Sequence, residues 1–299
     1  MLSTFDEYMK NNCIRLGFHM SVAGSIANAA LDAGEHGYGD FQMFTSNPRS
    51  WNSKPLDIDK VGLFKEYCNK YDTIPFSHLP YLFNLASPSE EQRMKSLNLL
   101  NDNLKRCDLM GIKYIVVHIG SHLGTGVDKG ISRITDAIND NIIDHKVMIL
   151  FENGAGYNNS VGSNMNEINE IFDKLNSDNI GLCLDTCHAF AAGYDLRDPK
   201  KLDFLVDDIK DLGKDKLKLV HLNDAKYELG SGMDRHEHLG KGKIGEKGFI
   251  NFFSNPFFQK GCFVMETPVD ELGNDYDYDE VSKIISKVNK QLNLDINFR

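Results

Sequence analysis

The sequence predicts an α/β fold, a single-domain barrel built from eight β/α units. Short apolar runs rich in β-formers alternate with segments of helical periodicity along the whole chain, which is typical of repeated βα units around a parallel sheet. A chain of 299 residues is long enough for one such barrel or for two ordinary domains. Because no Ser/Gly-rich linker, low-complexity block or repeat divides it, we expect one domain.

Eight apolar runs of strand length support the barrel. In chain order they are Arg15 to Phe18, Phe41 to Phe44, Thr73 to Ser77, Tyr114 to Val117, Val147 to Phe151, Gly181 to Leu184, Leu217 to Val220 and Cys262 to Met265. Eight is the number of strands in a closed (β/α)8 barrel. We expect the barrel domain to span residues 13–299, and residues 1–12 to form a flexible leader with no assigned role.

Three of the intervening helices have recognisable ends. Ser87 to Glu90 has the pattern of a capping box with proline at the first helical position, and Gly111 would end that helix. Asp198-Pro199 would open a second helix, which Gly213 stops. A third helix is expected near Glu280 to Gln291.

Five longer irregular segments interrupt the alternation. They are Thr45 to Leu56, His78 to Pro88, Asn153 to Asn164, His188 to Pro199 and Asn223 to Gly248. With one exception, each directly follows a predicted strand. Loops in that position gather at one face of a barrel, where the active sites of such folds lie.

Charge and composition restrict the classes of function. The formal net charge is −10, which argues against non-specific coating of DNA, so any contact with nucleic acid must be local or supplied by metal. No apolar run approaches the roughly 20 residues of a membrane span, and the N-terminus lacks the apolar core of a secretory signal. We therefore expect an intracellular, monomeric protein with reduced cysteines. A virion-associated location applies only if the source is a large DNA virus.

Metal-capable side chains stand where six successive predicted strands end. They are His78, His118, Glu152, Asp185, His221 and Glu266. A lone His or Glu at a strand end is more often a hydrogen-bonded structural residue than a ligand. Six in succession indicate a shared site, because a converging cluster of carboxylates would repel itself without cations.

Two short segments add three more candidates. His188 shares a face with Asp185 if the chain turns helical after the strand, and Asp234 and His236 point the same way in an extended loop. Imidazoles and carboxylates without thiolates suit Zn²⁺, with Mn²⁺ or Fe²⁺ as alternatives. At about three protein ligands per catalytic ion, nine ligands suffice for three ions. Three divalent ions together with four carboxylates would give the site a net charge of about +2, which favours an anionic substrate such as a phosphate diester.

Seven longer motifs run through the chain. They are F-T-S-N-P-R-S-W (44–51), V-H-I-G-S-H (117–122), F-E-N-G-A-G (151–156), G-L-C-L-D-T-C-H-A-F-A-A-G-Y-D (181–195), H-L-N-D-A-K (221–226), D-R-H-E-H-L-G-K-G-K-I-G (234–245) and M-E-T (265–267). In sequence and in order they resemble the motifs of the endonuclease IV family of apurinic/apyrimidinic endonucleases. The resemblance extends from about Arg15 to the last strand.

This resemblance implies a TIM barrel with a trinuclear zinc site. Carried over by motif, the ligands would be His78, His118 and Glu152 for one zinc, Glu152, Asp185, His221 and Glu266 for a second, and His188, Asp234 and His236 for the third. The implied reaction is hydrolysis of the phosphodiester 5′ to an abasic site in double-stranded DNA, leaving a 3′-hydroxyl and a 5′-deoxyribose phosphate in base excision repair. The implied catalytic residue is Glu152, which would orient or deprotonate the attacking water.

The resemblance also implies DNA contacts, from Arg49 and Trp51 in one loop and from Tyr81 and Leu82 in the next. The alternative for Trp51 and Tyr81 is packing within their loops. Basic residues on the same rim are candidate phosphate contacts. They are Lys226, Arg235, Lys241 and Lys243.

Some polar residues near the motifs match no family ligand. We expect His122 and His238 to support ligands or lie at the surface, and His19 to lie on the active rim without a metal role. Cys183 and Cys187 flank Asp185, but we expect buried thiols rather than zinc thiolates.

Two alternatives remain open at this point. A sugar isomerase or epimerase on a similar barrel would use one or two divalent ions and would not need His188, Asp234 or His236. A lesion-binding protein would recognise abasic DNA without cutting it. Metal content separates the first from the nuclease, and incubation with abasic DNA separates the second.

Overall fold

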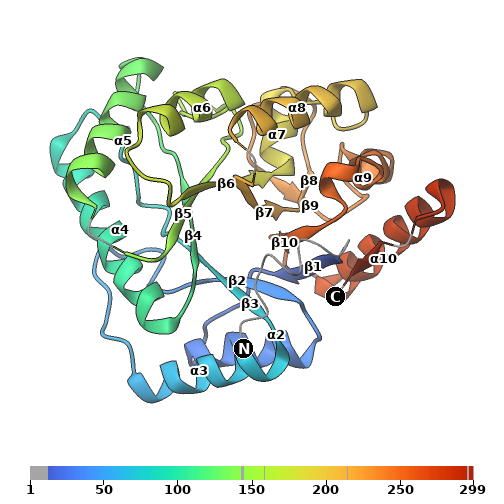
Figure 1. Ribbon diagram of the computed structural model, residues 1–299, viewed down its shortest axis with the longest axis horizontal. Helices are drawn as coiled ribbons and strands as arrows, with labels where there is room; N and C mark the ends of the chain where they lie inside the picture. The colour runs from blue at the N-terminus through green and yellow to red at the C-terminus, as the bar shows by residue number, and fades with distance from the viewer. Residues whose placement is uncertain (1–12, 143–144, 158, 214, 295, 299) are drawn as a thin grey trace.

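The computed structural model describes residues 13–142, 145–157, 159–213, 215–294 and 296–298. The leader predicted over residues 1–12 lies outside these described residues. Within them the predicted TIM barrel is confirmed, with strands at the centre and helices around them (Figure 1). No helix in the described ranges is long and apolar enough to cross a membrane.

Eight parallel strands make the barrel. They are β1 (Cys13–Phe18), β2 (Asp40–Phe44), β3 (Ile74–His78), β4 (Tyr114–His118), β5 (Met148–Glu152), β6 (Ile180–Asp185), β7 (Leu217–His221) and β10 (Gly261–Met265). The order β1-β10-β7-β6-β5-β4-β3-β2 is continuous, and a parallel bridge between His19 and Gln42 joins its two ends. Three two-residue strands complete the set: β8 (Asp224–Ala225) and β9 (His236–Glu237), which pair with each other, and β11 (Asn297–Phe298), which pairs with the start of β1.

The helices form a ring outside the strands (Figure 1). They are α2 (Ile26–Glu35), α3 (Ile58–Tyr71), α4 (Glu90–Met110), α5 (Val127–Asn141), α6 (Met165–Lys174), α7 (Thr186–Ala192), α8 (Pro199–Asp211), α9 (Gly245–Ser254) and α10 (Gly273–Leu292), with a 3-10 turn at η1 (Pro256–Phe258).

The predicted helix ends are correct in part. Asp198 caps α8 with proline in its first turn, as predicted. The capping box at Ser87 is wrong, because Ser89 caps α4 by accepting from Gln92 N, which leaves Pro88 before the helix. The segment His188 to Pro199 is not wholly irregular, since its first residues belong to α7. Helix α10 begins at Gly273, seven residues earlier than predicted.

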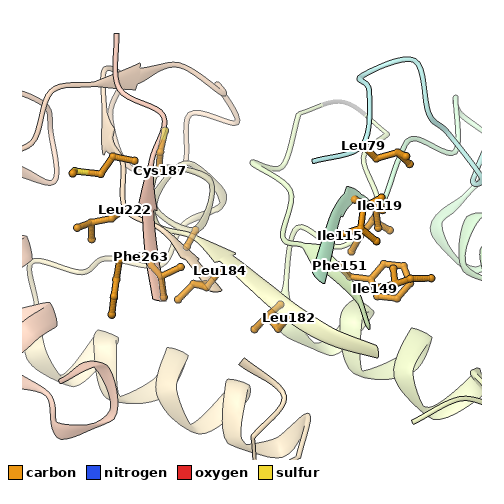
Figure 2. Close-up of a cluster of buried hydrophobic side chains, with 14 of the residues drawn as sticks. Leu79, Ile115, Ile119, Ile149, Phe151, Leu182, Leu184, Cys187, Leu222 and Phe263 are labelled. Atoms are coloured by element: carbon orange, nitrogen blue, oxygen red, sulfur yellow. The ribbon is translucent and has the colours of Figure 1, made fainter. Parts of the chain in front are cut away.

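Alternation along the strands divides the core into two layers. In β4, Ile115 and Val117 pack against the helices, whereas Tyr114 and Val116 belong to a separate cluster inside the barrel. Figure 2 shows part of the outer layer, with residues such as Phe151, Leu184 and Phe263 from other strands. Successive side chains of a strand point to opposite faces.

This alternation continues to the carboxyl ends of the strands. Phe76, Val116 and Leu150 point inward, so the residue two positions further along each strand points inward too. The same reasoning applies to Cys183, Leu219 and Val264. The inward-pointing residues above these layers are His78, His118, Glu152, Asp185, His221 and Glu266.

Candidate metal centre

The nine predicted ligands meet at the carboxyl end of the barrel. Seven of them line a pocket of about 340 Å³, together with Tyr81, Arg235 and Pro268. The other two, Asp185 and His221, are fully buried. The pocket thus combines donors that strand alternation directs inward with others that loops supply.

The donor atoms fall into three groups within which all lie less than 4.8 Å from one another. The groups are His78, His118 and Glu152; Glu152, Asp185, His221 and Glu266; and Asp185, His188 and His236. Glu152 belongs to the first two groups, and Asp185 to the second and third. Asp234 faces the third group, with its Oδ1 3.1 Å from His188 Nε2 and 3.5 Å from His236 Nε2.

Distances between facing donors fit ligands around shared cations. His78 Nε2 and His118 Nδ1 lie 3.2 and 3.3 Å from Glu152 Oε2. His221 Nδ1 lies 3.0 Å from Glu152 Oε1 and 3.4 Å from Glu266 Oε2. In a zinc tetrahedron with bonds of about 2.0–2.1 Å, neighbouring ligand atoms are about 3.3–3.4 Å apart. The donor set therefore fits zinc.

Three imidazoles direct their Nε2 atoms into the pocket. Backbone carbonyls accept from the Nδ1 atoms of His78, His188 and His236, at 2.8, 2.9 and 3.0 Å. Because a carbonyl only accepts, Nδ1 carries a proton, so Nε2 is the atom that each neutral ring can offer to a cation. Nε2 of His188 and of His236 is buried without a hydrogen-bond partner. Such atoms are costly unless something coordinates them.

The carboxylates of the pocket are ionised. Burial would raise the pKa of Glu152, but the facing imidazoles of His118 and His221 hold that pKa well below its usual range. Partial burial opposes ionisation of Asp234 as well, yet the neighbouring His188, whose own pKa is raised in the absence of a cation, lowers the pKa of Asp234 to about 2. The pocket therefore presents negative charge that divalent cations would neutralise.

Two buried asparagines hold Asp185 in place, and neither was singled out from the sequence. Asn153 Oδ1 accepts from Asp185 N at 2.7 Å, and its Nδ2 donates to Asp185 O at 3.2 Å. Asn223 Nδ2 donates to Asp185 Oδ2 at 2.7 Å. A sequence signal existed, because Asn153 directly follows Glu152 and Asn223 lies two residues after His221.

Asp224 fastens the base of the loop that carries Asp234 and His236. Its buried carboxylate accepts from five backbone N–H groups, those of Ala225, Gly240, Gly242, Ile244 and Gly245. A Cβ at Gly242 would collide with that carboxylate, so glycine is required there. Both ends of the loop are thereby tied to one side chain.

His238 fastens the same loop to α10. Its Nδ1 lies 2.8 Å from Asp277 Oδ2 and its Nε2 3.0 Å from Asp270 Oδ1. Asp277 is fully buried and also accepts from Leu239 N and Thr267 Oγ1. His238 is therefore a buried support of the ligand loop and not a surface residue.

Removing this support is expected to destabilise the fold. Asp277→Ala would leave three buried donors unpaired, so we expect the free energy of unfolding to fall by roughly 3–5 kcal/mol. The exposed Asp279 on the same helix offers the control, and Asp279→Ala should stay within about 0.5 kcal/mol of the unchanged protein. Urea unfolding followed by circular dichroism measures both, and equal losses would contradict the role of Asp277.

The other residues without a predicted metal role are also accounted for. His19 Nδ1 lies 3.0 Å from Gln42 Nε2 and 3.3 Å from Glu266 Oε1. His122 Nδ1 accepts from Gly126 N within the loop after β4. Cys183 and Cys187 are buried free thiols, which agrees with the prediction.

The predicted DNA contacts lie in different surroundings. Tyr81 is 64% exposed, and its ring centroid lies 5.8 Å from that of His118 and 5.9 Å from that of His78. Arg49 is exposed and Leu82 half-buried. Trp51 is half-buried against the main core, which favours the packing role left open for it.

The basic candidates lie on the loop after β7. Lys226 and Arg235 are both exposed, and Arg235 also lines the pocket. Lys243 instead pairs with Glu228 at 2.7 Å, and Lys241 Nζ lies 5.4 Å from the centroid of the Tyr276 ring. Of the four, Lys226 and Arg235 are the better placed for phosphate.

Fold and site together define a barrel enzyme with a candidate multi-metal centre, and a family model described as a xylose isomerase-like TIM barrel matches residues 30–288. A probable endonuclease 4 of Methanoculleus marisnigri is 43% identical over 268 residues, which is 88% of this chain and 95% of that protein. The chain belongs to the endonuclease IV family of apurinic/apyrimidinic endonucleases. It is therefore a nuclease, and hence a hydrolase.

Other relatives support the same family assignment. The apurinic-apyrimidinic endonuclease 1 of Plasmodium berghei is 37% identical over 294 residues, 94% of this chain and 57% of that protein. The crystal structure of endonuclease IV from Thermus thermophilus superposes with a TM-score of 0.80 at 32% identity, over 91% of this chain and 99% of that one. A D-tagatose 3-epimerase-like protein, at 18% identity and a TM-score of 0.69 over 93% of this chain and 99% of its own, shares the fold alone.

Proposed function

We propose that the chain hydrolyses the phosphodiester bond 5′ to an abasic site in duplex DNA, leaving 3′-hydroxyl and 5′-deoxyribose phosphate ends in base excision repair. The observation that carries the proposal is the three ligand groups linked through Glu152 and Asp185 in one pocket. Loaded with three divalent ions, the pocket would be cationic within a chain of net charge −10, which suits one phosphate diester bound locally and not the coating of a whole duplex.

Three zinc ions would be held by sets that match the first two groups and, in the third, have Asp234 in place of Asp185. His78, His118 and Glu152 would hold one, Glu152, Asp185, His221 and Glu266 the second, and His188, Asp234 and His236 the third. When bound, the ions would neutralise phosphate charge and make water more acidic. Mn²⁺ or Fe²⁺ are the alternatives that an imidazole–carboxylate set also accepts.

Glu152 occupies the centre of this arrangement. Its Oε2 faces His78 and His118, whereas its Oε1 faces His221 at 3.0 Å and His188 at 3.4 Å. A carboxylate between two groups is placed to orient the attacking water and to accept its proton. We assign Glu152 the catalytic role on this basis.

Selectivity for an abasic site would come from residues at the rim of the metal pocket. Tyr81 stands exposed beside the ligands, and Arg49 lies on the neighbouring loop. An abasic nucleotide has no base to unstack, so its extrusion into the pocket costs less than flipping an intact nucleotide. Tyr81 and Leu82 would press on the duplex near the lesion, and Lys226 and Arg235 would contact phosphates.

Cleavage of a defined substrate tests the proposal. We expect the zinc-loaded protein, as a monomer, to cut a duplex with one tetrahydrofuran abasic analogue once, on its 5′ side, and to leave an extendable 3′-hydroxyl. Intact strands would overturn the proposal and favour a lesion-binding protein. Elemental analysis should give about three zinc ions per chain, whereas one or two manganese or magnesium ions would favour an isomerase.

The Tyr81→Ala variant is expected to lose discrimination more than chemistry. Without the ring, the ratio of affinities for abasic and intact duplex should fall roughly 10-fold, while single-turnover cleavage at saturating DNA changes less. Fluorescence anisotropy on paired duplexes measures the ratio, with the equally exposed Tyr157→Ala as the control. An unchanged ratio would assign Tyr81 to packing.

A further inference from the structure

We propose that Gln42 is a positioning residue that fixes the tautomer of His221 and the orientation of Glu266, and thereby sets the affinity of the second ligand group for its metal ion. Gln42 lies in the middle of β2 and is fully buried. It points into the barrel, because its neighbours Phe41 and Met43 pack in the outer layer. This inference rests on the proposed function only in that the second group binds a divalent ion.

The orientation of the Gln42 amide follows from its neighbours. Its Nε2 lies 2.7 Å from Glu266 Oε1, and a carboxylate oxygen can only accept, so the NH₂ group faces Glu266. The second proton of that NH₂ group is directed to His19 Nδ1 at 3.0 Å. Both amide protons are thereby used, and the amide cannot be reversed without placing two acceptors together.

The amide orientation in turn determines the tautomer of His221. Gln42 Oε1 lies 2.9 Å from His221 Nε2. Because an amide oxygen only accepts, Nε2 carries the proton, and Nδ1 of the neutral ring keeps its lone pair. That Nδ1 is the atom that faces Glu152, Glu266 and Asp185 at 3.0, 3.4 and 3.9 Å.

Gln42 therefore acts on two ligands of one group at once. Its carbonyl holds the His221 ring with the lone pair toward the other donors, and its NH₂ group holds one oxygen of Glu266 so that the other faces His221. Among the described residues, no such contact links Gln42 to His118, His188 or His236. Replacing Gln42 should therefore change metal binding at the second ligand group and leave the other two groups unaffected.

The Gln42→Met variant tests this assignment, because methionine fills a similar volume without a donor or acceptor. Loss of an outer partner of a metal ligand lowers metal affinity by about 10–100-fold. We expect one of the three zinc ions to weaken by that factor and two to stay as in the unchanged protein. Metal-free protein titrated with zinc against a chromophoric chelator gives the affinities without DNA.

Gln259 provides a matched control. It is also a buried glutamine, but it donates to backbone carbonyls of Phe253 and Ser254, before the start of β10 and away from the ligands. Gln259→Met should bind all three zinc ions with unchanged affinity. Three unchanged affinities in Gln42→Met, or equal weakening of all three, would overturn the proposal.

A measurement on the unchanged protein covers the case in which Gln42→Met does not fold. Long-range ¹H–¹⁵N spectra report which nitrogen of each histidine ring is protonated. We expect the zinc-loaded protein to show His221 protonated at Nε2, and the opposite tautomer would overturn the assignment. Neither readout uses cleavage, so a protein that binds zinc this way without cutting abasic DNA would contradict the proposed function and not this inference.

Discussion

Replacing Glu152 with glutamine is expected to lower kcat for abasic-site cleavage by at least about 10³-fold while largely sparing DNA affinity. The glutamine keeps the size of the side chain but removes its charge and its capacity to take a proton. Glu152 is nearly fully buried and faces four imidazoles, more than any other described carboxylate of the site. Single-turnover cleavage and anisotropy on the same abasic duplex measure the two quantities.

A matched control for that experiment is Glu271→Gln. Glu271 is exposed and follows β10 by six residues, close in sequence to the candidate ligand Glu266. The Glu271→Gln variant should keep kcat within about twofold of that of the unchanged protein. Cleavage retained in Glu152→Gln would remove Glu152 from the catalytic role, whatever its part in metal binding.

Removing the metal ions is expected to abolish cleavage and to lower Tm by on the order of 10 °C. Ions that bind only the folded chain stabilise it by about 2.7 kcal/mol each at 100 times their Kd, and roughly 2–4 °C of Tm accompany each kcal/mol in a chain somewhat smaller than this one. Without cations, four carboxylates and the unpartnered His188 and His236 nitrogens share one pocket. Dialysis against a chelator followed by calorimetry measures the shift.

Restoring zinc provides the control for chelation. Cleavage and Tm should both return when zinc is added back, whereas magnesium should restore neither, because it prefers oxygen-only sites. Full activity in the chelated protein would contradict a metal-dependent reaction. A restored Tm without restored cleavage would separate metal binding from catalysis.

The sequence was informative where strand geometry dictates the outcome. All eight strands were predicted to within two residues of their bounds, because short apolar runs have few other interpretations. The strand-end position of His78 and Glu152 also implied their convergence, since parallel strands of a barrel end at one face. What the sequence lacked was the side on which each residue points, which depends on the register of the whole barrel.

Gln42 illustrates that limit. It is one polar residue within an apolar strand and belongs to none of the ligand types, so nothing local distinguishes it from a hydrogen-bonded core residue. Only closure of β1 against β2, through the bridge at His19 and Gln42, brings it to His221. Gln42 and His221 are far apart in the chain, and contacts between such distant residues leave no periodic pattern in the sequence.

Helix α7 was anticipated only as a possible helical turn after Asp185, for a different reason. Six of its seven residues are buried, so it has no polar face and no amphipathic period to detect. Its start is fixed instead by Asp185, whose side chain accepts from His188 N at 2.7 Å as an N-cap. The carboxyl group of Asp185 thus caps a helix and also belongs to the second and third ligand groups.

The attachment of the loop at Asp224 bears on how such a centre could arise. The loop leaves and re-enters the barrel at the side chain of Asp224, which holds its two ends together. The entropy cost of closing a loop grows only slowly with its length, so about twenty residues could be inserted or removed here at little cost. A barrel that already holds the first two groups could acquire Asp234 and His236 in a single insertion between β7 and α9. The loop would supply Asp234 and His236 to the third group, whereas Asp185 and His188 would have to be present already at the end of β6 and the start of α7.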